Sequence, residues 1–306
     1  MIEKYKLEKV ITTKKDFLKD TDFPKSSYYC LNRKERVTSL KRRGRKNNNL
    51  IFNRELERFF TKEELLSQYI IPILSSEFVS YGYQKLAKIL KNKGFLINKK
   101  RLYRILKEEK LLNSKRIKAN YVSFKRASLF IPDKPNQLWE ADYKSAYIKG
   151  EDRRARIFNL IDCFTKRLLL QVIGYSLPSS VIVPQIEKLL KDKAPLSLII
   201  RTDNGPEFRS YRFKELLEKY KVTHESIHIK HPEENSYIES YHSILEVEVL
   251  SRQEFESVEE LKGTLKRWEC FYNHLRIHSS IGYKAPVEFG EELESRCVKQ
   301  NKLVLV

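Results

Sequence analysis

A short apolar run ends abruptly at an acid in residues 196–208, LSLIIRTDNGPEF. A continuous apolar run of this length is typical of a β-strand covered on both faces, which predicts an α/β fold. The residues after it, Asp203, Asn204, Gly205 and Pro206, are common in turns, and Asn and Gly tolerate positive φ. Asp203 therefore has two interpretations. It belongs to a structural turn, or it is a functional acid at the carboxyl end of a central strand, where open α/β sheets form clefts.

The segments before this strand predict the rest of a sheet. Residues 138–148, LWEADYKSAYI, alternate between the two faces of a strand, and we expect Trp139 in the core. Two β-rich runs and a helical segment follow, so we expect an antiparallel meander, a helix and the buried strand in one α/β sandwich. The first strand carries Trp139, Ala141 and Tyr143 on one face and Glu140, Asp142 and Lys144 on the other; the later runs are 156–164 and 167–175, and the helix is 181–192.

A third segment adds another acid. Residues 231–250, HPEENSYIESYHSILEVEVL, predict a helix that starts near Asn235 and has Glu239 in its first turns. Asp142 and Asp203 on neighbouring strands and Glu239 on a covering helix could converge on one point, with 35 residues between the last two. The alternative is three unrelated surface acids among the forty acids of the chain.

Converging carboxylates suit one kind of chemistry. Cleavage or transfer of a phosphodiester needs cations that activate the attacking oxygen and stabilise the leaving oxygen, and carboxylates hold such ions. Three acids without clustered cysteine or histidine ligands favour Mg²⁺, or Mn²⁺, over zinc.

The histidines form a weaker candidate set. His274 and His278 have the i, i+4 spacing that binds a metal on a helix, but no third ligand is evident, so we interpret them as structural or DNA-contacting. His224, His228 and His231 lie in a predicted strand-to-loop region near the cleft, and His231 is a candidate for a contact with substrate phosphate.

Basic charge is concentrated in one part of the chain. Residues 1–128 hold 33 Lys or Arg against 13 Asp or Glu, a net charge of +20, whereas residues 129–306 hold 27 of each. Such a density of like charge predicts a polyanionic partner, and nucleic acid fits better than a membrane surface because no amphipathic anchor is evident. The alternative is a solvated basic surface without a partner.

Two features of this basic part predict DNA contacts. Residues 1–30 look helical, and the run KRRGRKNNN at 41–49 is either a linker or, as its charge favours, an arm that tracks DNA. Two short helices around Gly94, the second capped by Asn98, have the helix-turn-helix pattern, although an ordinary helical hairpin is the alternative. The residues predicted to contact DNA are Lys99, Lys100, Arg101 and Arg104 on the second helix and Arg42, Arg43 and Arg45 in the arm.

Other features of the sequence predict a cytoplasmic protein. No segment approaches the ~20 apolar residues of a membrane span, and the N-terminus lacks the apolar region of a signal peptide. The four cysteines, Cys30, Cys163, Cys270 and Cys297, form no CxxC pair and are expected to be reduced thiols.

Five motifs in order resemble one family. The chain is similar to the bacterial insertion-sequence transposases that have a retroviral-integrase-like DDE catalytic core, in particular to the second-frame (orfB-type) proteins. The motifs are WEADY, TDNGPEF and ENSYIES around the three acids, YNHLRIHSSIGYKAPVEF at 272–289, and the helix-turn-helix segment at 81–112.

This resemblance implies a fold and an activity. It implies an all-α helix-turn-helix DNA-binding domain at 51–128 after a basic region and arm at 1–50, and an RNase H-like integrase core with a C-terminal helical extension at 129–306. Asp142, Asp203 and Glu239 would bind Mg²⁺, or Mn²⁺, and the enzyme would cleave and join DNA strands at the ends of an insertion sequence. The alternatives are a DNA-binding protein with an inactive core and a stand-alone RNase H-like nuclease.

The resemblance also implies partners. These are double-stranded DNA, both terminal repeats and target, other copies of the chain on that DNA, and an upstream-frame helix-turn-helix protein as a partner or fusion. DNA binding would associate the protein with the nucleoid.

Three residues depart from the family pattern. Glu234 replaces the usual Asp, and Glu246 stands where a basic residue commonly faces DNA. Glu140 beside Asp142 is also unusual, and it is interpreted either as a spare ligand or as a neighbour that repels Asp142.

Overall fold

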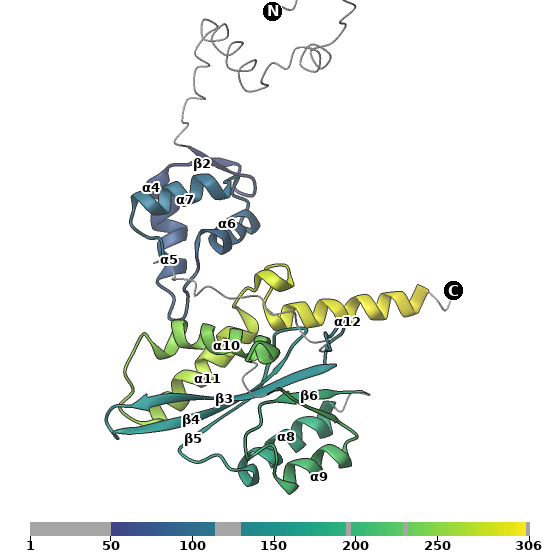
Figure 1. The fold of residues 1–306 in the computed structure, drawn as a ribbon. Helices are drawn as coiled ribbons and strands as arrows, with labels where there is room; N and C mark the ends of the chain where they lie inside the picture. Colours follow the sequence, from purple (N-terminus) through teal and green to yellow (C-terminus); the bar gives the residue numbers. More distant parts are fainter. Residues whose placement is uncertain (1–49, 114–129, 194–196, 229–231, 304–306) are drawn as a thin grey trace, which may run out of the picture. The chain divides into compact units, whose positions relative to one another are not determined.

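The computed structural model describes residues 50–113, 130–193, 197–228 and 232–303 (Figure 1). The predicted N-terminal helix, the arm with Arg42, Arg43 and Arg45, and His231 lie outside these residues. No helix among the described residues is long and apolar enough to cross a membrane.

A five-stranded mixed sheet with the order β5-β4-β3-β6-β7 forms the centre of the larger part. Its first three strands form the predicted antiparallel meander, and the short buried strand β6 pairs parallel with β3 on one side and with β7 on the other. The strands are β3 (Leu138–Ile148), β4 (Arg153–Asp162), β5 (Leu168–Gly174), β6 (Ile199–Thr202) and β7 (Thr223–Ser226).

Helices cover both faces of this sheet, as Figure 1 shows. One face packs against α8 and α9 around Trp139, which is fully buried as predicted. The other face packs against α10 and α11 around Trp268. The helical elements of this part are α8 (Ser179–Lys193), α9 (Tyr211–Lys219), η3 (Pro232–Asn235), α10 (Ser236–Leu245), η4 (Glu246–Leu250), α11 (Val258–His274), η5 (Ser279–Ile281) and α12 (Pro286–Leu303).

The N-terminal part contains a β-hairpin that the sequence did not predict, so the expectation of an all-α region there was wrong. The strands β1 and β2 have three residues each, too few to show an alternating pattern. Tertiary contacts form them: Ile51 and Phe60 are buried, and Asn53 accepts hydrogen bonds within the turn while its amide donates to the carbonyl of Lys93. The elements are β1 (Ile51–Asn53), β2 (Arg58–Phe60), α4 (Lys62–Leu65), η2 (Leu66–Ile70), α5 (Ile71–Leu74), α6 (Tyr83–Asn92) and α7 (Lys99–Glu108).

The two helices of the predicted helix-turn-helix pattern are present as α6 and α7. Gly94 ends the first with a φ of +81°, where a Cβ atom would lie 2.8 Å from Oδ1 of Asn53, and Asn98 caps the second by accepting a hydrogen bond from the N–H of Arg101 at 2.7 Å. Helix α7 ends at Glu108, before the helix-turn-helix segment ends at 112, because the chain turns at Lys110 with a φ of 56°.

Candidate active site

The three predicted acids lie on three adjoining elements. Asp142 is within β3, Asp203 directly follows β6, and Glu239 is in the first turn of α10. In the parallel pairing of β3 with β6, Ala141 is opposite Thr202, and the residue that follows each of these two in the sequence is an aspartate. The pairing thus brings Asp142 and Asp203 to the same level of the sheet.

Two of the acids, Asp203 and Glu239, act electrostatically on the third, Asp142. The pKa of Asp142 is raised to about 7, first by burial and then by the negative charges of Asp203, Glu239 and Glu140, against a hydrogen bond from the N–H of Tyr143. The side chain of Asp142 is 17% exposed. A carboxyl group in this position loses its proton at neutral pH more readily when a cation lies beside it.

The donor set fits a hard divalent cation, because all three groups are carboxylates. In the described part of the chain, no three Asp, Glu, His or Cys side chains already surround a point where a metal ion could be held. The three acids are therefore electrostatic neighbours without a closed cage, and their side chains would have to turn toward one another to share an ion.

The turn after β6 orients Asp203. Its Oδ1 accepts a hydrogen bond from the N–H of Gly205 at 3.0 Å, and the amide of Asn204 donates to the carbonyl of Ile227 at 2.7 Å. Neither Asn204 nor Gly205 has positive φ. Glycine is required here for space, because a Cβ atom at 205 would lie 2.9 Å from Oδ1 of Asp203. The turn exists, and Asp203 lies at the carboxyl end of the strand as expected. Its role as a functional acid remains a prediction.

Glu140 is not a spare ligand, because the structure commits both of its oxygens, but it is a neighbour that repels Asp142, since its charge raises the pKa of that residue. Oε1 pairs with Nη1 of Arg201 at 3.0 Å, and Oε2 accepts the N–H of Ile238 at 2.8 Å. Burial raises the pKa of Glu140, although these two donors favour its charged form. Sequence reasoning missed Arg201, whose signal was a charged residue at the end of an otherwise apolar run.

His242 is a second residue that sequence reasoning missed. Its Nδ1 lies 3.7 Å from Oδ2 of Asp142, and its Nε2 lies 3.0 Å from the amide nitrogen of Asn159. The Asn159 oxygen accepts a hydrogen bond from Gln171, so its NH₂ group faces His242 and the proton of the neutral imidazole is on Nδ1. Burial and then the charge of Lys144 lower the pKa of His242 to about 4. The signal in the sequence was the i, i+3 spacing from Glu239.

The two other departures have partners in the structure. Glu246 forms an ion pair with Lys144 of β3 at 3.0 Å. A basic side chain therefore lies next to the position where the family commonly has a basic residue. The carboxylate of Glu234 accepts a hydrogen bond from the N–H of His228 at 2.7 Å.

The remaining histidines that the structure describes belong to no cluster that could hold a metal ion. His274 is the last residue of α11, whereas His278 is buried beyond that helix, so the pair does not share one helix face. Nε2 of His224 lies 2.9 Å from Oγ1 of Thr202.

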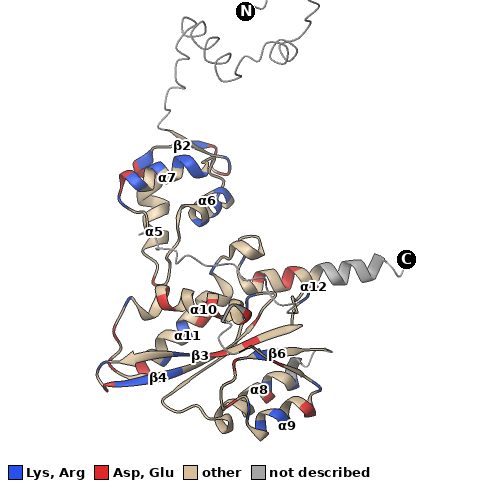
Figure 2. Ribbon diagram, in the orientation of Figure 1, with Lys and Arg blue, Asp and Glu red and all other residues tan. Residues whose placement is uncertain are grey.

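The basic face predicted to contact DNA lies on α7 (Figure 2). Lys99, Lys100 and Arg104 are exposed, whereas Arg101 is partly buried and donates to the carbonyl of Leu50 at 3.2 Å. The DNA-contacting role of this face remains a prediction.

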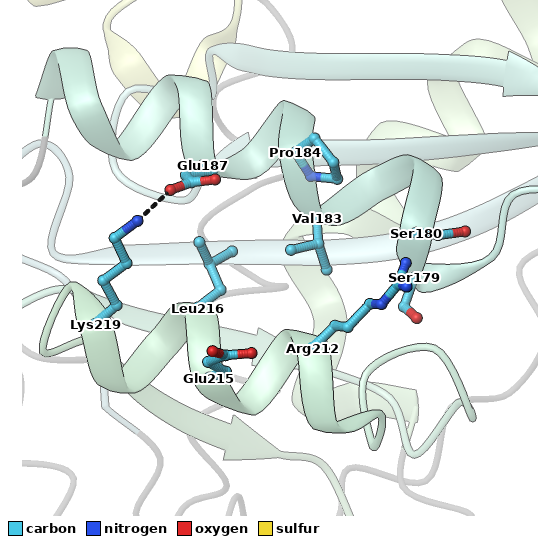
Figure 3. A pocket seen from close by; sticks show the side chains of 9 residues that line it. All are labelled: Ser179, Ser180, Val183, Pro184, Glu187, Arg212, Glu215, Leu216 and Lys219. Carbon is cyan, nitrogen blue, oxygen red and sulfur yellow. Dashed lines mark hydrogen bonds and ion pairs between the residues drawn. The ribbon is translucent and has the colours of Figure 1, made fainter.

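A cavity of about 250 Å³ lies elsewhere, between α8 and α9 (Figure 3). Val183 and Leu216 line it, and the ion pair between Glu187 and Lys219, at 2.7 Å, lies at one end. None of the three acids lines this cavity, so it is distinct from the candidate active site.

Known proteins match the part of the chain that contains this site. Two family models for the integrase core domain match residues 132–232 and 220–286. The uncharacterized 31.7 kDa protein of insertion element IS407 from Burkholderia multivorans is 28% identical over 229 residues, which are 75% of this chain and 82% of the relative. The transposase for insertion sequence element IS904 from Lactococcus lactis is 26% identical in an alignment of 248 positions that covers 74% of this chain and 94% of the relative.

The solved structure of the catalytic core domain of BIV integrase is also similar, with a sequence identity of 20% and a TM-score of 0.41. The match covers 54% of this chain and 99% of that chain. The matched models define the larger part of the molecule as an integrase core. The chain belongs to the bacterial insertion-sequence transposases of this family.

Proposed function

We propose that this protein is a DNA transposase that uses Asp142, Asp203 and Glu239 to cleave and join DNA strands at the ends of an insertion sequence. The observation that supports the proposal is the β3–β6 register, in which the residues before Asp142 and Asp203 are direct partners, while Glu239 is in the first turn of a helix that packs on the same sheet. The matched integrase core supports the reaction class.

The three carboxylates would hold Mg²⁺, and Mn²⁺ would substitute for it because both prefer oxygen ligands. The bound ions would activate the attacking oxygen and stabilise the leaving oxygen of the phosphodiester. The chain itself contributes the fixed turn at Asp203 and the neutral His242 beside Asp142.

We further propose that the N-terminal part reads the DNA. The exposed basic face of α7 would contact DNA, with the segment at 41–49 as an additional basic arm. Joining two element ends requires that both be held at once, so we expect several copies of the chain on the DNA. An upstream-frame protein is a further proposed partner.

Asp203→Asn tests the proposal. The variant keeps an oxygen for the Gly205 N–H but removes one charge from the acidic site. We expect loss of Mg²⁺-dependent cleavage and strand transfer, unchanged DNA binding, and a melting temperature without metal that is equal to or above that of the wild type. The measurements are strand transfer on terminal-repeat DNA, with any upstream partner supplied, and thermal unfolding with and without Mg²⁺.

Asp162→Asn is the matched control, because Asp162 is a purely structural acid. Its carboxylate accepts hydrogen bonds from the N–H groups of Asn136 and Thr165. One amide oxygen cannot replace both carboxylate oxygens, so we expect a loss of about 1–3 kcal/mol in the free energy of unfolding, with activity retained in the folded fraction. An Asp203→Asn protein that still transfers strands would refute the metal-site assignment.

A further inference from the structure

A buried ion pair between Glu140 and Arg201 lies next to the three acids. The two side chains are 0% and 2% exposed, and their charged atoms are 3.0 Å apart. Removing two such charges from water is expensive, and an apolar pair of similar volume often stabilises a fold equally well. Stability alone therefore does not explain this pair.

The pair fixes the register of the two strands that carry acids. Glu140 and Arg201 are direct partners in the β3–β6 ladder. Each precedes an aspartate by two residues, and residues two apart on a strand point to the same face. A slip of one residue would separate the charges and turn Asp142 and Asp203 to different faces. The ion pair penalises that slip.

The same pair also holds the helix that carries the third acid. The second carboxylate oxygen of Glu140 accepts the N–H of Ile238, the residue directly before Glu239. The side chain of Asn235, at the N-cap position of α10, makes no capping hydrogen bond. Glu140 on β3 therefore acts as the cap of this helix from a neighbouring element, and it sets the position of the first turn against the sheet.

The remaining donors of Arg201 secure its position. Its guanidinium donates to the carboxylate of Glu225 on β7 at 2.7 Å, to the carbonyl of Glu234 at 3.2 Å and to the carbonyl of Phe130 at 3.0 Å. The side chain is thus bound to the sheet and to the segment that leads into α10. A guanidinium with this many partners has little freedom to move.

We propose that Glu140 and Arg201 are positioning residues of the transposase active site, which together hold the three acid-bearing elements so that one metal site can form. This inference rests on the proposed function, because it assigns the pair to the same site. Neither residue touches the reacting groups.

The test replaces the pair in the full-length chain by Glu140→Leu with Arg201→Met. We expect a folded protein that binds Mn²⁺ about 10- to 100-fold more weakly, as is typical when a residue that orients metal ligands is removed. We also expect faster amide hydrogen exchange confined to the first turn of α10. The measurements are Mn²⁺ titration calorimetry and peptide-resolved hydrogen exchange without metal.

A matched control is available in the same core. Glu248 and Arg276 form another buried ion pair, at 2.8 and 2.9 Å, which contacts none of the three acids. Glu248→Leu with Arg276→Met should leave both Mn²⁺ affinity and exchange at 236–239 unchanged.

The outcomes separate this inference from the proposed function. Unchanged Mn²⁺ affinity in the Glu140 and Arg201 double variant, with affinity abolished in Asp203→Asn, would overturn the positioning role and leave the metal site intact. If the wild type binds no Mn²⁺, the proposed function fails, and unchanged exchange in the first turn of α10 then overturns the positioning role as well. Should the double variant not fold, Glu140→Gln, which keeps an oxygen for Ile238, is measured in the same way.

Discussion

His278 illustrates how one buried residue makes stability depend on pH. It is 7% exposed, and its ring lies edge-on to Tyr272. Burial and then the positive charges of Arg276, Lys85 and Lys166 lower its pKa to about 2. The folded protein therefore keeps this imidazole neutral throughout the physiological range.

Acidification should destabilise the protein through this residue. The folded-state pKa of His278, about 2, is below the unfolded value of about 6.5, so between these values the unfolded chain binds a proton that the folded chain does not. From about pH 7 to 5.5 we expect a loss of roughly 1 kcal/mol in the free energy of unfolding from this group. Urea unfolding at both pH values measures it. His278→Gln should lose that much less over the same interval, and an identical loss in both proteins would contradict the assignment.

At the scale of elements, α7 combines a buried apolar face with an exposed basic one. Leu102, Ile105 and Leu106 are buried, whereas Lys99, Lys100 and Arg104 face solvent. Basic residues in the first turn oppose the helix dipole and weaken the helix. The cap at Asn98 offsets this effect locally, and the charge is explained if an anion is bound there.

Removing charge from α7 should weaken DNA binding more than removing it from α8. We expect Lys99→Ala with Lys100→Ala and Arg104→Ala to weaken binding of terminal-repeat DNA. The slope of log affinity against log salt concentration should become shallower by about one for each phosphate that the variant no longer neutralises. The control replaces the exposed Lys188 and Lys191 of α8 by Ala. Fluorescence anisotropy over a salt series measures both, and equal weakening would place the recognition surface elsewhere.

At the scale of the whole molecule, the excess charge is divided unequally between the two parts. The net charge of +20 is that of residues 1–128, and residues 129–306 are neutral in sum. The integrase core therefore has no overall charge with which to attract DNA from a distance. We therefore expect the N-terminal part to attract a polyanion.

Binding of the intact protein to duplex DNA should depend steeply on salt. If roughly six to ten phosphates are contacted, affinity should fall by roughly 10³–10⁵ between about 50 and 200 mM salt. The measurement is an equilibrium titration of duplex DNA at several salt concentrations. A separate comparison of residues 1–128 with residues 129–306 locates the effect, and binding by the second fragment alone would contradict the domain assignment.

The sequence alone determined the features that depend on local order along the chain. The apolar run before Asp203 predicted β6, and Gly94 and Asn98 predicted the turn between two helices. These features are legible because propensity, capping and turn chemistry act over a few neighbouring residues.

Only the tertiary structure decided what depends on residues distant in sequence. The β1–β2 hairpin forms because its residues pair and are buried by the rest of the fold. Its two strands have three residues each, too few to show an alternating sequence pattern. The pairing of Glu140 with Arg201, 61 positions apart, follows from the strand register, and no local rule specifies that register. The sequence therefore determined which acids are present and on which elements. Non-local packing decided how the strands that carry Asp142 and Asp203 are aligned. The effect of a buried charge such as Glu140 depends on the partner that the fold places beside it, here Arg201.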